Sequence, residues 1–359
     1  MKNTNLLLRL LFLSIIFTAC TEDNDIAPVQ GDFDNGIIIS SEGNFGDKDG
    51  SVAFLDGDMS RKATNFIYTS VNNAQLGGLV QSIGFSENDA FIIINDAHAI
   101  SVVDRITFEK KTIVLEELKN PRYMVVEGGK GYVTNWGEGG DPSDDYIAVL
   151  NLETYAVESK ISLKNGVEHI VAKDGFLYVS HKGAWAEGNL VSVVNTSTNT
   201  VVAEIEVNYR PDEMFFTKDN SLVVLCEGSP VYDASWNVIG NSQASITYID
   251  TQSNSVDKHV NFAENKRANH IAYNSDQIYY VSDEALYTVN TSDSSLPATS
   301  MLEIGSVYGM NVKDGNLYTV KKEFENLSQL NVIALEGANV GELIHSSAVG
   351  LGASKIYFN

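Results

Sequence analysis

A pattern of apolar runs repeats along most of this sequence. One set of runs ends in a valine followed by two polar residues, as in residues 131–135 (GYVTN) and 176–181 (FLYVSH). A second set, such as residues 191–196 (VSVVNT), ends in Asn or Asp before a polar turn, where that side chain caps its own backbone. A third set, such as residues 200–207 (TVVAEIEV), alternates apolar and polar residues, which is typical of a half-exposed outer strand.

A fourth run precedes each member of the first set, as in residues 122–127 (RYMVVE) and 168–173 (EHIVAK). Each unit therefore holds about four antiparallel strands, which is the content of one β-propeller blade, and we count about seven units. Residues 352–359 (GASKIYFN) end as an innermost strand with nothing after it, and residues 36–44 (GIIISSEGN) begin as a second strand with nothing before it. We predict an all-β, seven-bladed propeller over residues 36–359, closed by strands from both termini that share one blade.

The first 35 residues have the features of an export signal and a linker. Lys2 and Arg9 precede or interrupt an apolar run over residues 6–17, which is too short to span a membrane. The run leads to FTAC, which ends at Cys20 and resembles a bacterial lipobox. We predict a lipoprotein signal peptide over residues 1–19 and an acidic flexible tether over residues 20–35 from a lipidated Cys20. The alternative is an ordinary secretory signal that is cut nearby.

The net charge restricts the binding partners of the protein, and the cysteine content restricts its disulfide bonds. The formal net charge of −23 argues against unassisted binding to nucleic acid or to an anionic membrane surface. Contact with a membrane is therefore expected through the lipid anchor only. Cys226 is the remaining cysteine, and its place at the end of an apolar run predicts a small buried residue without a disulfide.

Aromatic residues gather in one kind of loop. The three tryptophans all follow a second strand, in three successive units, and the first of these loops is the long segment of residues 135–146 (NWGEGGDPSDDY). Long loops on a rigid scaffold often carry binding sites. We expect the loops to form a binding face, and the alternative is that they pack only on one another. The aromatic candidates are Trp136, Trp185, Trp236, Tyr232 and Phe45.

The loops between units are predicted to surround the mouth of the central channel on the same face. Their candidates for ligand binding are Arg122, His169, Arg210, Asn269, His270 and Tyr308, with His181 nearby in a strand-end position. Taken singly, each could equally be a turn residue or an ion-pair partner between blades. Glu168, Asp212 and Asn269 could also hold a calcium ion, as in some propeller hydrolases, but this is the weaker interpretation.

Sequence motifs for catalysis are lacking: there is no phosphate loop, no HExxH and no nucleophile elbow. The glycines of residues 137–140 (GEGG) do not open a helix, so they carry no nucleotide signal. We therefore expect a binding protein and not an enzyme, with no cofactor or metal of its own.

Residues 191–214 (VSVVNTSTNTVVAEIEVNYRPDEM) resemble the YVTN-type propeller repeat of YncE-like and DUF5074-type proteins. Together with the lipobox and the acidic tether, they resemble the BtuG family of Bacteroidetes surface lipoproteins. This resemblance implies outer-membrane, cell-surface display and capture of corrinoids (vitamin B12 and cobinamide) for a BtuB-like, TonB-dependent transporter. One of His169, His181 and His270 would then be able to meet the cobalt. A glycan- or protein-binding propeller of another uptake complex stays open as the alternative.

Overall fold

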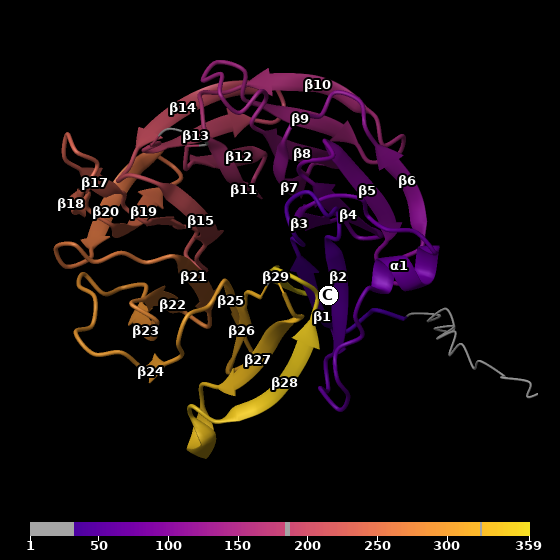
Figure 1. Ribbon diagram of the computed structural model, residues 1–359. Coiled ribbons are helices and arrows are strands. Elements are labelled where there is room, and N and C mark those ends of the chain that lie inside the picture. Colours follow the sequence, from indigo (N-terminus) through magenta and orange to yellow (C-terminus); the bar gives the residue numbers. More distant parts are fainter. Residues whose placement is uncertain (1–31, 184–186, 324) are drawn as a thin grey trace, which may run out of the picture.

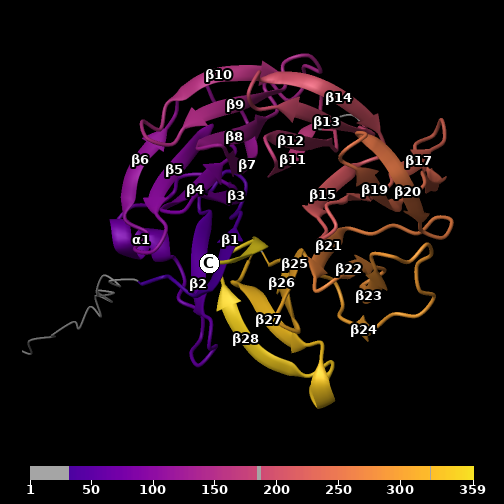
Figure 2. The same cartoon turned by 180° about the vertical axis from the view of Figure 1, so that it is seen from behind.

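A computed structural model describes residues 32–183, 187–323 and 325–359. Seven antiparallel sheets are arranged in a ring around a central channel, and the C-terminus lies beside that channel (Figure 1). The same ring is seen from behind in Figure 2. The prediction of an all-β, seven-bladed propeller is confirmed.

We number the blades in chain order and give the strands of each from the channel outward. Blade 1 contains β29 (Ala353–Phe358), β1 (Gly36–Ser41) and β2 (Ser51–Asp56). Blade 2 contains β3 (Val80–Phe85), β4 (Asp89–Ile94), β5 (Ala99–Asp104) and β6 (Lys110–Val114). Blade 3 contains β7 (Pro121–Glu127), β8 (Lys130–Asn135), β9 (Tyr146–Asn151) and β10 (Val157–Ser162). Blade 4 contains β11 (Val167–Lys173), β12 (Phe176–His181), β13 (Leu190–Asn195) and β14 (Thr200–Glu206).

The remaining blades follow the same order. Blade 5 contains β15 (Pro211–Phe216), β16 (Leu222–Cys226), β19 (Ser245–Asp250) and β20 (Ser255–Asn261). Blade 6 contains β21 (His270–Asn274), β22 (Gln277–Ser282), β23 (Ala285–Asn290) and the short β24 (Leu302–Glu303). Blade 7 contains β25 (Gly309–Lys313), β26 (Asn316–Lys321), β27 (Ser328–Ala334) and β28 (Leu343–Val349). Outside the blades lie the hairpin of β17 (Pro230–Tyr232) and β18 (Val238–Asn241), the helix α1 (Ile67–Asn72) and the 3-10 turn η1 (Gly337–Asn339).

Blade 1 closes the ring with strands from both ends of the chain. β29 pairs with β1 in antiparallel register, with Ile37 opposite Phe358 and Ser40 opposite Lys355. Thr64 forms an antiparallel bridge with Phe54 on the outer edge, where the other blades carry a fourth strand. The closure predicted from the two incomplete ends is therefore confirmed.

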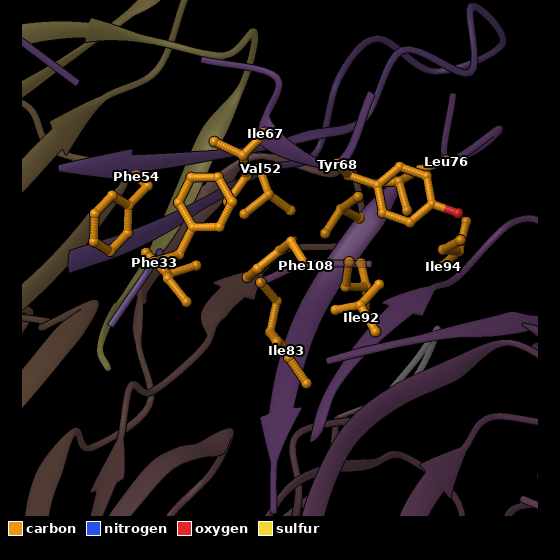
Figure 3. Packing of buried hydrophobic residues seen from close by; sticks show 14 of the residues in the cluster. Phe33, Val52, Phe54, Ile67, Tyr68, Leu76, Ile83, Ile92, Ile94 and Phe108 are labelled. Atoms are coloured by element: carbon orange, nitrogen blue, oxygen red, sulfur yellow. The ribbon is translucent and has the colours of Figure 1, made fainter. Parts of the chain in front are cut away.

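The hydrophobic core is divided among the interfaces between neighbouring blades. Side chains on a strand alternate between the two faces of its sheet, so β1 sends Ile38 toward blade 2 and Ile37 and Ile39 toward blade 7. Figure 3 shows the cluster between blades 1 and 2. Second strands such as β4 are buried on both faces, whereas outer strands such as β14 are mostly exposed, as the alternation predicts.

Phe33 belongs to this core although it lies in the segment predicted as a tether. Its ring is buried at 5.3 Å from the ring of Phe54 and 5.5 Å from that of Phe108, measured between centroids. Its backbone N–H donates to the carbonyl of Ile106. The packed part of the chain thus includes Phe33, three positions before the predicted domain start.

Two further predictions concern the cysteine residues. Cys226 is a free, fully buried thiol, as predicted, and burial raises its pKa to about 11. Cys20, by contrast, lies outside the described residues. Within the described part of the chain, no helix has the length and apolar character needed to cross a membrane.

Candidate functional site

The channel along the axis of the ring contains two cavities joined end to end. The first, which we call the channel mouth, has a volume of about 460 Å³. The second, the channel interior, has a volume of about 400 Å³. Tyr123, Glu213, Ser354 and Lys355 line both. The mouth is further lined by polar residues from the starts of the innermost strands and nearby loops: Glu42, Gln81, Asn95, Arg122, Glu168, Lys182, Asp212, Glu227, Asn269, His270 and Tyr308.

Arg122 joins three blades at the mouth. Its Nε and Nη2 donate to the two carboxylate oxygens of Glu168, at 3.1 and 2.7 Å, and its Nη1 donates to Oε1 of Gln81 at 2.6 Å. The guanidinium also lies 3.8 Å from the ring centroid of Trp136. Burial alone would lower the pKa of Arg122, but the charge of Glu168 more than offsets this and the pKa is raised. Such a bidentate, stacked arginine is a rigid part of the wall.

A second charged network surrounds Asp212 between blades 4 and 5. His169 Nδ1 lies 2.7 Å from Oδ1 of Asp212, and the ammonium of Lys182 donates to Oδ2. Lys182 also donates to Glu227 at 3.0 Å, and Arg210 Nε reaches the same carboxylate at 3.4 Å. Burial acts to raise the pKa of Asp212, but Lys182 and His169 outweigh it and hold that pKa well below its usual range.

A third group, formed by Lys355, Glu213 and His270, lies between the two cavities. Oε1 of Glu213 is 3.8 Å from Lys355 Nζ and 3.9 Å from His270 Nδ1, so both contacts are longer than hydrogen bonds. The other oxygen of Glu213 accepts from the backbone N–H of Ile271 at 2.9 Å. Burial acts to raise the pKa of Glu213, whereas His270 and Lys355 lower it to about 2.

The inter-blade candidates predicted from sequence have different surroundings. Arg122, Asn269, His270 and Tyr308 line the channel mouth, and His169 lines the channel interior. The hydroxyl of Tyr308 donates to Glu42 at 3.2 Å. Arg210 lines neither cavity, and its Nε donates to Glu227 at 3.4 Å. His181 is buried inside blade 4, where its Nδ1 and Nε2 are bonded to Asn165 O and Ser192 Oγ, and burial lowers its pKa.

The aromatic loop candidates are not gathered in one place. Trp136 is half-buried in the core between blades 3 and 4, and its indole N–H donates to the carbonyl of Val167 at 2.6 Å. Trp236 is 82% exposed on the β17–β18 hairpin, with Tyr232 at 6.0 Å between ring centroids. Phe45 is also highly exposed, in the loop after β1. Trp185 lies outside the described residues.

Several residues of the mouth were missed by the sequence analysis, above all Lys355, Lys182 and Glu227. Lys355 is the third residue of β29, and the third residues of β7, β11 and β15 are Tyr123, His169 and Glu213. All four line the channel interior. Because the sequence predicts the final strand as innermost, its alignment with the other innermost strands identifies this lysine as a channel residue. Lys182 and Glu227 directly follow second strands, and no motif distinguishes them.

The acids considered as calcium ligands already have basic partners. Glu168 is paired with Arg122, and Asp212 with Lys182 and His169. Among the described residues, no three His, Cys, Asp or Glu side chains are grouped so that they could hold a metal ion. The arrangement is that of a cavity lined by paired charges that adjoins a second cavity of mixed lining.

Comparison with solved structures supports the fold. The chain is similar to a functionally unknown protein from Desulfotomaculum acetoxidans, at a TM-score of 0.63 and 12% identity over 90% of this chain and 98% of that one. It is also similar to the hydrazine synthase of Kuenenia stuttgartiensis, at a TM-score of 0.58 and 15% identity over 77% and 88%. For apo AztD from Citrobacter koseri the TM-score is 0.54, with 14% identity over 89% and 96%. At these identities the likeness concerns the fold alone.

Sequence comparison gives the family. No curated protein matches the chain in sequence. Residues 35–233, more than half of the 359, match the family described as a domain of unknown function, DUF5074. The chain therefore belongs to the DUF5074 family.

Proposed function

We propose that this protein is a lipid-anchored capture protein of the outer-membrane surface, which binds corrinoids and passes them to a TonB-dependent transporter. The apolar run and the FTAC segment that ends at Cys20 support the anchor, and the acidic residues after Cys20 support display outside the cell. The DUF5074 family leaves the ligand open, so the proposal on the ligand depends on the channel mouth.

The observation that carries the proposal is the convergence of four predicted residues, Arg122, Asn269, His270 and Tyr308, on one cavity. Asn269 is exposed there and presents an amide, while Tyr308 presents an aromatic ring and a hydroxyl group. A corrinoid is a broad disc with amides around its edge. Placed over the mouth, it would exchange hydrogen bonds with Asn269 and cover Tyr308, in the manner of ligand sites that combine apolar contact with a few polar groups.

The three histidines predicted to reach cobalt are not equivalent as candidates. His270 lines the mouth, and its Nδ1 is buried without a hydrogen-bond partner among the described residues. His169 uses Nδ1 to bind Asp212, and His181 uses both ring nitrogens inside blade 4. Because His270 is the one of the three that lines the mouth, a cobalt contact is proposed for His270 and not for the other two.

The test is incubation of the purified protein with cyanocobalamin, followed by gel filtration and a visible spectrum. We expect the corrinoid to co-elute with the protein. By calorimetry, Asn269→Ala and Tyr308→Ala should each weaken binding about 5- to 30-fold, as expected for loss of about 1–2 kcal/mol. The matched control is Asn199→Ala, in a turn of blade 4. Absence of binding at micromolar protein would overturn the corrinoid proposal.

Location is tested separately in cells. Cys20→Ala should release the protein from the membrane fraction. Replacement of Glu22, Asp23 and Asp25 by Ala should leave the protein anchored but protected from protease added to intact cells. If the triple variant is still cleaved on intact cells, the acidic segment is not an export signal.

A second candidate function, glycan or protein binding, is favoured by the β17–β18 hairpin. Its exposed apolar side chains are Val231, Tyr232, Trp236, Val238 and Ile239. Exposed aromatic residues of this kind stack on sugar rings or contact protein partners. A glycan array and a transporter pull-down, each repeated with Trp236→Ala, would separate this function from corrinoid capture at the mouth.

A further inference from the structure

The middle of the channel contains an ammonium group, that of Lys355, which forms no hydrogen bond with a described residue and lies 5.8 Å from the ring centroid of Tyr123. Lys355 lies on β29, and its ion pair with Glu213 is 3.8 Å long, which is too long for a hydrogen bond. An ammonium has three N–H donors, and its burial is costly unless they are satisfied. Lys355 is a partly exposed group that lines both cavities, so these donors are accessible from the channel.

His270 adds a second unsatisfied group beside Lys355. Its Nδ1 is buried and has no hydrogen-bond partner in the described part of the chain, and it lies 3.9 Å from the same Glu213 oxygen that faces Lys355. Lys355 and His270 come from blades 1 and 6, while Glu213 comes from blade 5. The closed ring thus places the Lys355 ammonium and the His270 imidazole near one carboxylate oxygen of Glu213, and neither forms a hydrogen bond with that oxygen.

The other cations around the mouth are already satisfied by acids. Arg122 is bound to both oxygens of Glu168, and Lys182 bridges Asp212 and Glu227. Asp212 is hydrogen-bonded to Lys182 and His169, while Glu213 is the acid that forms an ion pair with Lys355. An anionic group entering the channel would find its strongest available donor at Lys355.

Below Lys355 the wall of the channel interior mixes polar side chains, such as Ser82, His169 and Asn311, with apolar ones. The wall contains Met124, Met214 and Met310 from three blades, together with Ile170 and Ile356. Phe215 also contributes, stacked on Tyr273 at 5.1 Å between ring centroids with an interplanar angle of 6°. Methionine adapts its shape to flexible apolar groups. The channel interior therefore presents three methionine side chains in the same cavity as the ammonium group of Lys355.

We propose that the channel interior binds a small amphipathic organic carboxylate, with its carboxylate on Lys355 and its hydrocarbon body among Met124, Met214 and Met310. The carboxylate supplies the acceptor that Lys355 lacks, and the hydrocarbon covers the methionine side chains of the wall. This site shares Lys355 with the mouth but takes a different ligand, so octanoate binding and cyanocobalamin binding are separate tests.

The first experiment is calorimetry of the wild-type protein with butyrate, hexanoate, octanoate and 1-octanol. We expect affinity to rise about fourfold for each methylene from butyrate to octanoate, which corresponds to about 0.8 kcal/mol per buried methylene. Octanol, which has no carboxylate, should bind at least about tenfold more weakly than octanoate. Failure of octanoate to bind at millimolar concentration, or equal binding of octanol, would overturn the proposal.

The second experiment assigns the site to Lys355. Lys355→Met should weaken octanoate binding about 10- to 100-fold, as expected for loss of a charge-assisted hydrogen bond. The matched control Lys110→Met, on an exposed position of β6, should leave the affinity unchanged. Unchanged affinity in Lys355→Met would contradict the proposal. If this variant does not fold, Met310→Gln serves instead. It should weaken octanoate but not butyrate, and an equal effect on both would count against the apolar site.

Discussion

Trp136 and Trp236 occupy corresponding loops of blades 3 and 5, after the second strand, but their environments are opposite. Trp136 packs in the core between blades 3 and 4, under the guanidinium of Arg122. Trp236 is 82% exposed at the tip of a hairpin. The hairpin lies at the outer edge of the ring, away from β29 (Figures 1 and 2). Equivalent positions in a repeat therefore do not imply an equivalent role.

The hydrogen bonds of the two loops explain the difference. After β8, the N–H of Trp136 donates to the carbonyl of Asn120, and the amide of Asn120 donates to the carbonyl of Gly137. These bonds hold the first loop against the start of its own blade. After β16, the chain instead pairs with itself in β17 and β18, and Asp233 accepts from the backbone of Ser235 and Asn237 in the turn. The second loop satisfies its own backbone and can extend from the ring.

The largest expected effect comes from removing the channel wall itself. Deletion of residues 353–359 removes β29 with its buried Ala353 and Ile356, and leaves the edge of β1 without a partner strand. We expect loss of a cooperative thermal transition, measured by circular dichroism. Replacement of residues 230–241 by a short Gly-Ser linker is the control on the peripheral hairpin and should preserve the transition. A deletion variant with an unchanged midpoint would show that closure by β29 is unnecessary.

Glu168→Ala tests the rigid charge pair beside Trp136. Arg122 and Glu168 are mostly buried, with side-chain exposures of 13% and 5%. Removal of one partner leaves a buried charge, so we expect the free energy of unfolding in urea to fall by about 3–5 kcal/mol. The double variant Arg122→Met, Glu168→Leu should recover much of this loss. A single variant as stable as the wild type would mean that water replaces the carboxylate at no cost.

The pH dependence of stability should reveal Glu213 in the channel. Its pKa is lowered from an ordinary value of 4.5 to about 2 in the folded state. A lowered acid pKa contributes stability that is complete above pH 4.5 and is lost as the pH falls toward 2, by up to about 3 kcal/mol. Urea melts between pH 6 and 2.5 should show a steeper loss for the wild type than for Glu213→Gln. The exposed control Glu153→Gln should behave as the wild type. Parallel curves for wild type and Glu213→Gln would contradict this assignment.

Trp136→Ala should destabilise the protein by about 2–3 kcal/mol, because it leaves a void between blades and removes the contact with Arg122. Trp136→Phe keeps most of the ring but loses the indole N–H that bonds Val167, so its loss should be near 1 kcal/mol. The measurement is a urea melt at neutral pH. If Trp136→Ala is as stable as the wild type, its loop is not part of the core.

The smallest expected effect is that of Trp236→Ala. An exposed side chain outside the ring should change the free energy of unfolding by no more than about 0.5 kcal/mol. The same variant should weaken any partner that uses the hairpin and leave cyanocobalamin binding at the mouth unchanged. A stability loss comparable with that of Trp136→Ala would remove the contrast between the two loops.

Much of the fold could be predicted because it depends on local patterns. Alternation along residues 200–207 identifies an outer strand, and the incomplete ends at residues 36–44 and 352–359 identify the shared blade. The positions of Arg122, Asn269, His270 and Tyr308 near the channel mouth followed from placing them between blades. The partners of those residues could not be predicted, because Glu168 and Gln81 meet Arg122 only through neighbouring blades.

The sequence by itself thus determined the repeat, the number of blades and the closure, since the period-two alternation and the turn residues act over a few neighbouring positions. Only the tertiary structure decided which charges are satisfied and which aromatic residues are buried. Lys355, Glu213 and His270 are distant in the chain and meet because seven innermost strands converge on one axis. Burial and electrostatic pairing depend on everything that surrounds a group, and in a closed ring those surroundings come from blades that are remote in sequence.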